Sequence, residues 1–341
     1  MAKLSSLHLD PLVLSWIHCF LSNRSQRTVI DNHHSSATNV ISGVPQGSVL
    51  GPLLFLVFIN DLPCNISSSI RLFADDCILY RRISSNNDQV LLQNDLNEIT
   101  NWCTRWLMTL NVSKCKYMTV SRKRNSLNYQ YSLRSIPLTQ VESYRYLGIT
   151  ITSKLSWSEH ILNIVAESSK SLNRLRRYLA VSPPFIRKLA YETFIRTKLE
   201  YASPIWNPHQ SYLIEALESV QSRSARFITS CYDRRTSVSG IKSSLDIPPL
   251  SFRRKISQLC LFHKLYYSFP QLHCTFLLPP NRTSRRLFNS LSLQRLHGST
   301  NAFQKSFLPS AIELWNELPD AVVTERDANK FKTLLLTHLF R

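Results

Sequence analysis

Glycine is scarce in this sequence. Only six of the 341 residues are glycine, and they form neither a G-x-G-x-x-G series nor a Walker-type phosphate loop. Collagen-like repeats and glycine-rich linkers are excluded for the same reason. Nucleotide binding through either of those two motifs is therefore ruled out.

Long apolar runs are also missing. The longest near-continuous run, residues 49–59, is broken by Gly51 and Pro52 and is well short of the roughly 20 residues that a membrane helix needs. The N-terminus has no small-residue cleavage site of the kind that ends a secretory signal. We therefore expect an intracellular protein, nuclear or cytoplasmic, with no signal peptide, no transmembrane segment and no membrane partner.

Cysteine pairs are absent as well. The eight cysteines are scattered, and no two of them form a C-x-x-C pair. In an intracellular chain of this size, such scatter predicts buried free thiols rather than disulfides.

Acidic residues are few. The sequence has 41 Lys and Arg against 22 Asp and Glu, a net charge of +19. Residues 1–150 hold 14 basic and 9 acidic side chains (+5), whereas residues 151–341 hold 27 and 13 (+14). This excess predicts a polyanionic partner and places its contact surface in the second half. With 43% hydrophobic residues, the chain has ample material for a folded core.

Local patterning predicts a mixture of strands and helices, so the fold class is α+β. Residues 27–31 and 38–42 indicate two strands around a polar turn. Residues 70–73 and 77–80 indicate a hairpin with Ala74-Asp75-Asp76 at its tip. Helical spacing of apolar residues is found at residues 53–59, 88–107, 161–179, 212–228 and 327–339.

The predicted helix at residues 161–179 is amphipathic. Its apolar residues share one face, and Lys170, Arg174 and Arg177 fall on the opposite face. One interpretation is a solvated charged face. The other is contact with nucleic-acid phosphates, which further basic clusters favour: Arg187-Lys188, Arg234-Arg235, Arg253-Arg254-Lys255 and Arg285-Arg286.

Three of the six glycines lie within nine residues, at Gly43, Gly47 and Gly51. Glycine lets the main chain approach a ligand closely, and proline suits the start of a helix. This segment therefore predicts a ligand-contacting loop, with a plain turn before a buried helix as the alternative. Downstream, Asp75 and Asp76 offer the oxygen ligands that hard cations such as Mg²⁺ prefer, although paired acids in a turn are common.

Five motifs follow one another in a fixed order. They are GVPQGSVLGPLLF at residues 43–55, NDLP at 60–63, FADD at 73–76, Asn111-x-x-Lys114 and Tyr144-x-Tyr146-Leu147-Gly148. This series closely resembles the reverse transcriptases of non-LTR, LINE-type retrotransposons of the jockey-like kind. The similarity continues to the region after the polymerase, at residues 199–203 and 314–319.

The resemblance implies synthesis of DNA from deoxynucleoside triphosphates on an RNA template with a DNA primer, and Mg²⁺ as cofactor. Asp75 would bind the metal ions with Asp76 beside it, and Lys114 would protonate the leaving pyrophosphate. Template and nucleotide would be contacted by Gly43, Pro45, Gln46, Gly47 and Phe73. The primer end would be held by Tyr144, Tyr146, Leu147 and Gly148. The nucleic-acid backbone would be contacted by Lys170, Arg174 and Arg177 on a thumb helix.

The sequence also departs from the family pattern. The family carries its first metal-bridging aspartate on a strand with a Phe-Asp signature upstream of the glycine loop, and no such segment or fingers subdomain is found here. Two-metal phosphoryl transfer needs oxygen ligands around both ions, so we expect an N-terminally truncated, catalytically impaired enzyme.

The predicted organisation has three parts. They are an incomplete, ferredoxin-like palm at residues 1–150, a basic helical thumb at 151–236 and a helical C-terminal region at 237–341. Two alternatives stay open: a non-catalytic nucleic-acid-binding remnant, and a non-functional product of a decayed element.

Overall fold

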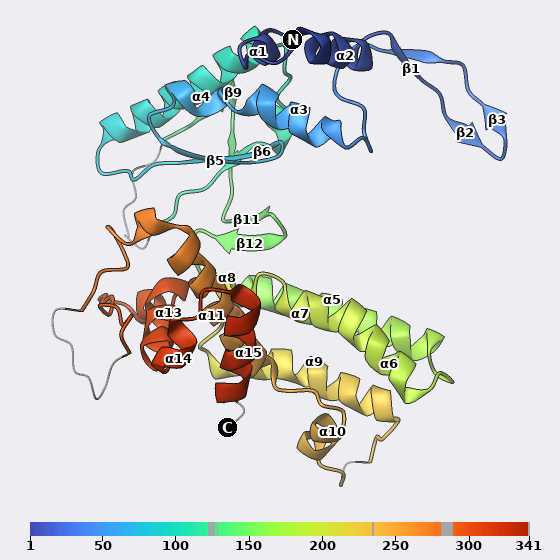
Figure 1. The fold of residues 1–341 in the computed structure, drawn as a ribbon, viewed down its shortest axis with the longest axis vertical. Coiled ribbons are helices and arrows are strands. Elements are labelled where there is room, and N and C mark those ends of the chain that lie inside the picture. The colour runs from blue at the N-terminus through green and yellow to red at the C-terminus, as the bar shows by residue number, and fades with distance from the viewer. Residues whose placement is uncertain (122–126, 128, 234, 281–288, 340–341) are drawn as a thin grey trace. The chain divides into compact units, whose positions relative to one another are not determined.

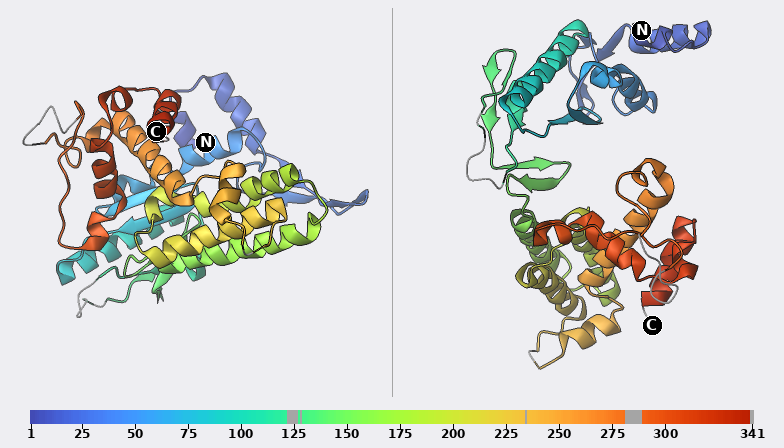
Figure 2. Two further views of the ribbon diagram at one scale, coloured as in Figure 1. Left: turned by 90° about the horizontal axis from the view of Figure 1, so that it is seen from below. Right: turned by 90° about the vertical axis from the view of Figure 1, so that its left-hand side faces the viewer.

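The computed structural model describes residues 1–121, 127, 129–233, 235–280 and 289–339. The chain divides into two compact units, Met1–Val141 (unit 1) and Glu142–Arg341 (unit 2), which Figures 1 and 2 show as ribbons. Helices and strands are mixed, which confirms the α+β class. Within the described residues the strands form six separate two-stranded sheets, so the ferredoxin-like palm remains a prediction.

Unit 1 is built around two longer helices and several strand pairs. Its helices are α1 (Ala2–Ser5), α2 (Pro11–Leu21), α3 (Leu50–Ile59), η1 (Leu62–Asn65), α4 (Asn86–Arg105) and η2 (Val112–Lys114). Its strands are β1 (Arg24–Gln26), β2 (Val29–Ile30), β3 (His33–His34), β4 (Thr38–Val40), β5 (Ser69–Phe73), β6 (Asp76–Tyr80), β7 (Lys116–Tyr117), β8 (Ser132–Leu133), β9 (Ile136–Pro137) and β10 (Thr139–Gln140).

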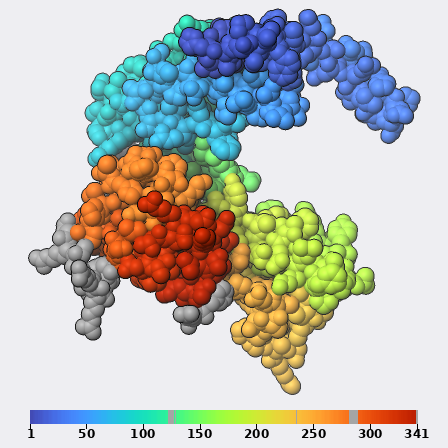
Figure 3. Space-filling model, in the orientation of Figure 1, coloured from blue at the N-terminus to red at the C-terminus, as the bar shows by residue number. Residues whose placement is uncertain are grey.

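The strands β1 to β4 make an exposed ribbon. Antiparallel pairing joins β1 to β4 and β2 to β3, and the turn at Asp31 and Asn32 has positive φ at both residues (46° and 65°), as a two-residue type I′ turn requires. In the view of Figure 3 the ribbon projects as an arm from the rest of unit 1. The prediction is confirmed only in part. Both predicted segments contain a strand, but the two strands do not pair with each other: β4 pairs with Arg24–Gln26, and β2 pairs with His33–His34, inside the predicted turn.

The helix α4 organises the core of unit 1. Ser85 and Asp88 form a capping box at its start, which satisfies backbone N–H groups of the first turn. One stretch of α4, at Ile99 and Cys103, packs with Ile59 and Leu62. An earlier stretch packs against the cluster of Tyr131, Leu133 and Leu138 through Leu92 and Leu96.

A buried acid on α4 ties it to the chain before β5. The carboxylate of Asp95 accepts hydrogen bonds from the backbone N–H groups of Ser67 and Ser68, both at 2.9 Å, and from the Ser67 hydroxyl at 3.0 Å. Burial raises the pKa of Asp95, but the hydrogen bonds lower it by more, and the net shift is downward. The acid therefore stays ionised and fixes where β5 begins.

Lysine 3 lies in an aromatic cage. Its Nζ sits over the rings of Phe58, Trp102 and Trp106, at 4.9, 4.5 and 4.0 Å from their centroids. The same atom donates to the carbonyl of Phe58 and to the carboxylate of Asp61. Cation–π attraction and an ion pair thus hold α1 against α3 and α4.

Unit 2 begins with a hairpin and continues as helices. The hairpin strands are β11 (Ser143–Tyr146) and β12 (Ile149–Thr152). The helices are α5 (Ser158–Tyr178), α6 (Pro184–Tyr191), the π-helical turn η3 (Glu192–Arg196), α7 (Thr197–Glu200), α8 (Ser203–Trp206), α9 (Ser211–Thr229), α10 (Val238–Ser244), α11 (Leu250–Ser268), η4 (Pro270–Leu272), α12 (Asn301–Gln304), α13 (Phe307–Asn316), α14 (Asp320–Val323) and α15 (Ala328–Leu339).

Two apolar clusters stabilise unit 2. In the first, α5 and α9 run side by side (Figure 2) and bury Ile161, Leu172 and Leu217 together with Trp206. The second, which we call the C-terminal cluster, joins α11 to α13, α14 and α15 around Trp315. The predicted helices at 161–179, 212–228 and 327–339 are confirmed, with ends shifted by at most three residues.

All eight cysteines are free, as the sequence predicts. Their predicted burial holds fully only for Cys103. It is wrong for four of the others, since Cys19, Cys64, Cys77 and Cys274 are exposed. In the described part of the chain, no helix is long and apolar enough to cross a membrane.

Candidate nucleotide and nucleic-acid site

The acidic hairpin is an antiparallel pair with a two-residue turn. Phe73 in β5 pairs with Asp76 in β6, so Ala74 (φ 51°) and Asp75 form the turn. The sequence predicted both acids at the tip, but Asp76 is the first residue of a strand. Both carboxylates are exposed, and the Phe73 side chain is 62% exposed beside them.

The two carboxylates fit a hard cation only in part. Oxygen ligands suit Mg²⁺, and these two are adjacent and solvent-accessible. Within the described residues, however, no group of three or more His, Cys, Asp and Glu side chains could hold a metal ion. The hairpin by itself is therefore not a complete metal site.

Two side chains hold the glycine loop in place: Ser48, which belongs to the loop, and Arg24, which precedes it in the sequence. The Ser48 hydroxyl donates to the Pro45 carbonyl at 2.7 Å and accepts from the Gly51 N–H at 3.0 Å. The Arg24 guanidinium donates to the carbonyl of Gly43 at 2.5 Å and to that of Leu21 at 3.0 Å. These bonds connect the loop to the end of α2 and to the start of α3.

The glycines of this loop are needed for two different reasons. Gly43 and Gly47 have φ of +79° and +81° with open space around them, a conformation that L-residues adopt at a cost. At Gly51, a Cβ would lie 2.9 Å from the Pro45 carbonyl oxygen. Gln46 and Gly47 are exposed on the outer side of the loop, where a ligand can reach them.

The segment Asn111 to Lys114 is a turn with an exposed lysine. The Ser113 hydroxyl donates to the Asn111 side-chain oxygen at 2.6 Å, and the Lys114 N–H donates to the Asn111 carbonyl at 3.1 Å. The Lys114 side chain points into solvent. The strand β7 follows and pairs in parallel with β10, which anchors the turn to unit 1.

The predicted primer-holding segment is the β11–β12 hairpin, and it belongs to unit 2. Leu147 and Gly148 form its turn, with φ of +46° and +82°. Leucine is strained in that region, and the Tyr201 hydroxyl donates to its carbonyl at 3.0 Å. A Cβ on Gly148 would lie 3.2 Å from the Tyr201 ring. Tyr144 on β11 is 43% exposed.

A buried histidine joins this hairpin to α5. The Nδ1 atom of His160 accepts from the Thr150 N–H at 3.2 Å, and the ring lies edge-on to Trp206 at 5.7 Å. Burial lowers the pKa of His160, and the nearby charge of Arg145 lowers it further. The imidazole is therefore neutral near pH 7, as its acceptor role requires.

The basic face of α5 is exposed as predicted. Lys170, Arg174 and Arg177 point into solvent, away from the buried Ile161 and Leu172. Lys170 pairs with Glu167 at 2.9 Å. This hydrogen bond and charge lower the pKa of Glu167, and Lys198 and Arg174 lower it further, which shows that the face is locally positive.

The other basic clusters do not all face outward. Arg187 is 8% exposed and Arg254 is 1% exposed, and Arg253 makes an ion pair with Glu200. The expectation that these arginines meet phosphates is wrong, because each is committed to a partner inside unit 2. Of the Arg234-Arg235 pair, Arg235 is exposed, whereas Arg234 and the Arg285-Arg286 pair lie outside the described residues.

Sequence reasoning missed two positioning residues. Arg24 holds the carbonyls of the glycine loop, and Tyr201 supports the β11–β12 turn. Tyr201 falls in the 199–203 motif, so its position had been identified but not its role. Nothing in the local pattern marks Arg24.

Comparison with known proteins identifies the family of the N-terminal part of the chain. Residues 1–151 match the family described as reverse transcriptase (RNA-dependent DNA polymerase). This part of the chain therefore belongs to the reverse transcriptase family. The relatives described next support the LINE type, that of non-LTR retrotransposons, for this domain.

Three relatives from Drosophila melanogaster support that assignment. The probable RNA-directed DNA polymerase from transposon X-element is 29% identical over 58% of this chain and 23% of its own length. The RNA-directed DNA polymerase from mobile element jockey is 33% identical over 43% of this chain and 17% of its own length. The probable RNA-directed DNA polymerase from transposon BS is 28% identical over 62% of this chain and 25% of its own length. The chain thus spans a quarter or less of the length of these relatives.

Proposed function

We propose that residues 1–151 form the nucleotide-facing part of a LINE-type RNA-directed DNA polymerase and that the basic face of α5 contacts the backbone of an RNA–DNA hybrid. One observation carries the first part. Phe55 and Ile59 of α3 share an apolar cluster with Ile70, Leu72 and Leu79 of the acidic hairpin. The glycine loop, which leads into α3, and the paired acids are therefore held by one core.

The exposed candidate residues of unit 1 each have a role in the proposal. The main chain at Gln46 and Gly47 contacts the templating base and the incoming deoxynucleoside triphosphate, with Phe73 beside them. Lys114 is a proton donor for the pyrophosphate leaving group, and general acids of this kind contribute by lying within hydrogen-bond reach. Asp75 and Asp76 would hold Mg²⁺, which would offset the negative charge of the triphosphate.

For residues 1–341 taken alone, we propose that the chain binds nucleic acid but does not polymerise DNA. Asp75 and Asp76 supply only part of the ligands that two-metal phosphoryl transfer requires. Loss of one bridging carboxylate costs several kcal/mol in the transition state, and each 1.36 kcal/mol is about tenfold in rate. The exposed cations of α5 do not depend on that ligand set, which favours retained binding.

Primer extension tests the catalytic part. The 341-residue chain is incubated with a primed RNA template, deoxynucleoside triphosphates and Mg²⁺ or Mn²⁺, and we expect no extension above background. The Asp75→Asn variant is the matched control, because it removes one charge from an exposed turn residue. Extension that disappears in Asp75→Asn would contradict the proposed impairment.

A salt titration tests the binding part. Affinity for an RNA–DNA hybrid should fall by about 0.7 to 0.9 log units per log unit of salt for each phosphate contacted. Reversal of Lys170, Arg174 and Arg177 to glutamate should weaken binding and flatten this slope. The control Glu167→Gln frees Lys170 and should strengthen binding.

The same titration separates the remaining candidates. An unchanged slope after charge reversal would mean that α5 presents only a solvated face. Absence of both extension and salt-dependent binding would favour the non-functional product of a decayed element.

A further inference from the structure

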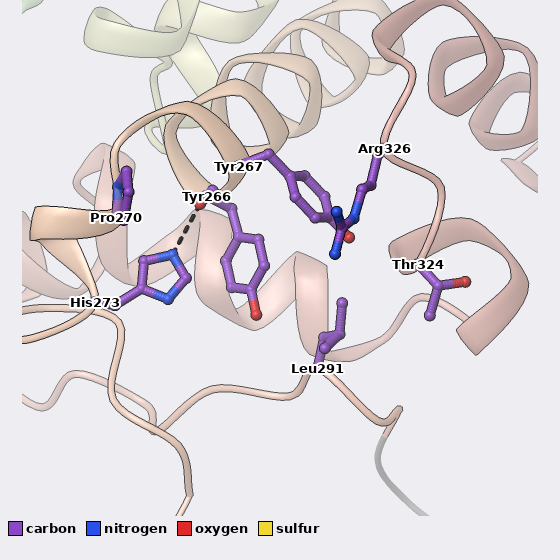
Figure 4. A pocket seen from close by; sticks show the side chains of 7 residues that line it. All are labelled: Tyr266, Tyr267, Pro270, His273, Leu291, Thr324 and Arg326. Atoms are coloured by element: carbon purple, nitrogen blue, oxygen red, sulfur yellow. Dashed lines mark hydrogen bonds between the residues drawn. The ribbon is translucent and has the colours of Figure 1, made fainter.

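A pocket opens in the C-terminal cluster, outside the residues to which a role has been assigned so far. Its volume is about 480 Å³, within the range of roughly 300 to 1,000 Å³ that small-ligand sites occupy. Figure 4 shows its walls. Tyr266 and Tyr267 come from the end of α11, His273 follows η4, and Thr324 and Arg326 come from the chain between α14 and α15.

The Tyr266 ring is a rigid part of the wall. It contacts the rings of His273, Tyr267 and Trp315, with centroids 4.6, 5.0 and 5.3 Å away. Within the described residues its hydroxyl has no hydrogen-bond partner, whereas the Tyr267 hydroxyl donates to the Val323 carbonyl at 2.6 Å. Burial raises the pKa of Tyr266, so this free hydroxyl remains a donor at neutral pH.

The charged group in the wall is the guanidinium of Arg326. Arg326 forms no ion pair within the described residues, although Glu325 and Asp327 flank it. The carboxylate of Glu325 accepts from the Asp327 N–H at 2.8 Å. The carboxylate of Asp327 accepts from the N–H groups of Asn329 and Lys330, at 3.0 and 2.8 Å. Both acids are thus engaged by backbone at the start of α15, and no acid lines the pocket.

His273 adds a polar edge of defined orientation. Its Nε2 lies 2.8 Å from the Tyr266 carbonyl oxygen, which can only accept, so Nε2 carries the proton. The other ring nitrogen, Nδ1, is left as an acceptor for a ligand N–H. The pocket therefore offers a ligand the ring and the free hydroxyl of Tyr266, the guanidinium of Arg326 and the Nδ1 acceptor of His273.

The sequence around the pocket points to an anionic ligand. No Asp or Glu occurs between Asp246 and Glu313, although nine Lys and Arg fall in that stretch. The tyrosines, His273 and Leu291 of the pocket wall belong to it. A lipid tail would leave the Tyr266 hydroxyl without a hydrogen bond, and a cation would face Arg326 with no carboxylate to hold it.

We propose that this pocket binds one unpaired nucleotide of a single-stranded nucleic acid, with the base against the Tyr266 ring and the adjacent phosphate on Arg326. Aromatic rings bind unpaired bases of any sequence by stacking. The site adds a strand contact to the polymerase and thumb surfaces proposed above, and it is independent of Asp75 and of the basic face of α5.

Photocrosslinking tests this proposal at the level of single residues. The 341-residue chain is irradiated with a short single-stranded RNA that contains 4-thiouridine, and the attachment sites are mapped by mass spectrometry. We expect attachment within residues 264–276, which include Tyr266 and His273. Because the site is mapped directly, strand binding by α5 does not obscure the result.

Matched variants make the test selective. Tyr266→Leu should weaken capture about tenfold, whereas Tyr266→Phe keeps the ring and should retain most of it. Arg326→Gln changes an exposed residue that does not support the fold. It should lower the crosslinking yield at residues 264–276, and it should reduce the slope of log affinity against log salt concentration by about 0.7. Lys330→Gln removes one charge nearby without touching the pocket and should leave the attachment unchanged.

Two results would overturn the proposal. One is attachment that avoids residues 264–276 or is unaffected by Arg326→Gln. The other is a competition result: uridine monophosphate blocks the crosslink as effectively as the unlabelled oligonucleotide at equal nucleotide concentration. That result would assign the pocket to a free nucleotide instead of a strand.

Discussion

Arg187 is expected to be a structural residue, and its replacement distinguishes that role from phosphate binding. Its guanidinium donates to the carbonyls of Leu179 and Ala180, at 3.1 and 2.6 Å, just after α5. It also donates to the Phe227 carbonyl at 3.1 Å and to the Ser230 hydroxyl at the end of α9. One cation thus satisfies the carboxyl ends of two helices, where the helix dipole favours positive charge.

The magnitude follows from those four acceptors. Each hydrogen bond contributes about 1 kcal/mol net, and somewhat more with a charged donor. The desolvation of the buried guanidinium offsets part of this gain. We expect Arg187→Leu to lower the free energy of unfolding of unit 2 by about 3 kcal/mol, and Arg187→Lys by about half as much because one ammonium reaches fewer acceptors.

Urea denaturation of the 341-residue chain, followed by far-ultraviolet circular dichroism, measures this loss. Lys188→Gln is the matched control, since it removes a charge from the same turn of α6 without disturbing those acceptors. A change below about 0.5 kcal/mol for Arg187→Leu, together with a salt slope for nucleic acid reduced by about 0.9, would refute the structural role.

Three further outcomes are expected, each measured by urea unfolding. The pKa of Asp95 lies below the unfolded value of about 3.9, so its stabilisation is present above about pH 4 and is lost as the pH falls through the folded pKa. Asp95→Asn should therefore cost about 2 kcal/mol at pH 7 and much less at pH 3; an equal loss at both pH values would contradict this. Lys3→Met should cost about 1 to 2 kcal/mol because it removes the cation from the aromatic cage and from Asp61, and an unchanged midpoint would show that α1 is held by other contacts. Gly47→Ala should cost about 1 kcal/mol because of its positive φ, whereas Gly47→Asn should cost less; equal losses would point to a cause other than backbone strain.

Short-range pattern was enough to identify several of the longer elements of this chain, although α2, α11 and α13 were not predicted. The helices α4, α5 and α9 follow from apolar spacing within about twenty residues, since one face must be buried whatever the partner is. The β5–β6 hairpin follows from two apolar runs around a polar turn. The family motifs likewise lie in continuous segments, such as residues 43–55, and could be recognised without a structure.

Local pattern could not predict whether an individual charged side chain is exposed or buried. Lys170 and Arg187 both lie on amphipathic helices of the same unit, yet the first is exposed and the second is buried. The difference arises because the acceptors of Arg187 at Phe227 and Ser230 are 40 and 43 residues away in sequence. Burial of a guanidinium depends on such distant carbonyls, which no local pattern contains.

The sequence by itself determined the class of the protein and the positions of its motifs, because these depend on residue order alone. Only the tertiary structure decided which groups meet. Lys3 and Asp61 are 58 residues apart, and Leu147 and Tyr201 are 54 apart. The pocket at Tyr266 likewise needs Arg326 from a later part of the chain. Such contacts form when apolar faces close on one another, and their geometry is set by packing rather than by the order of residues.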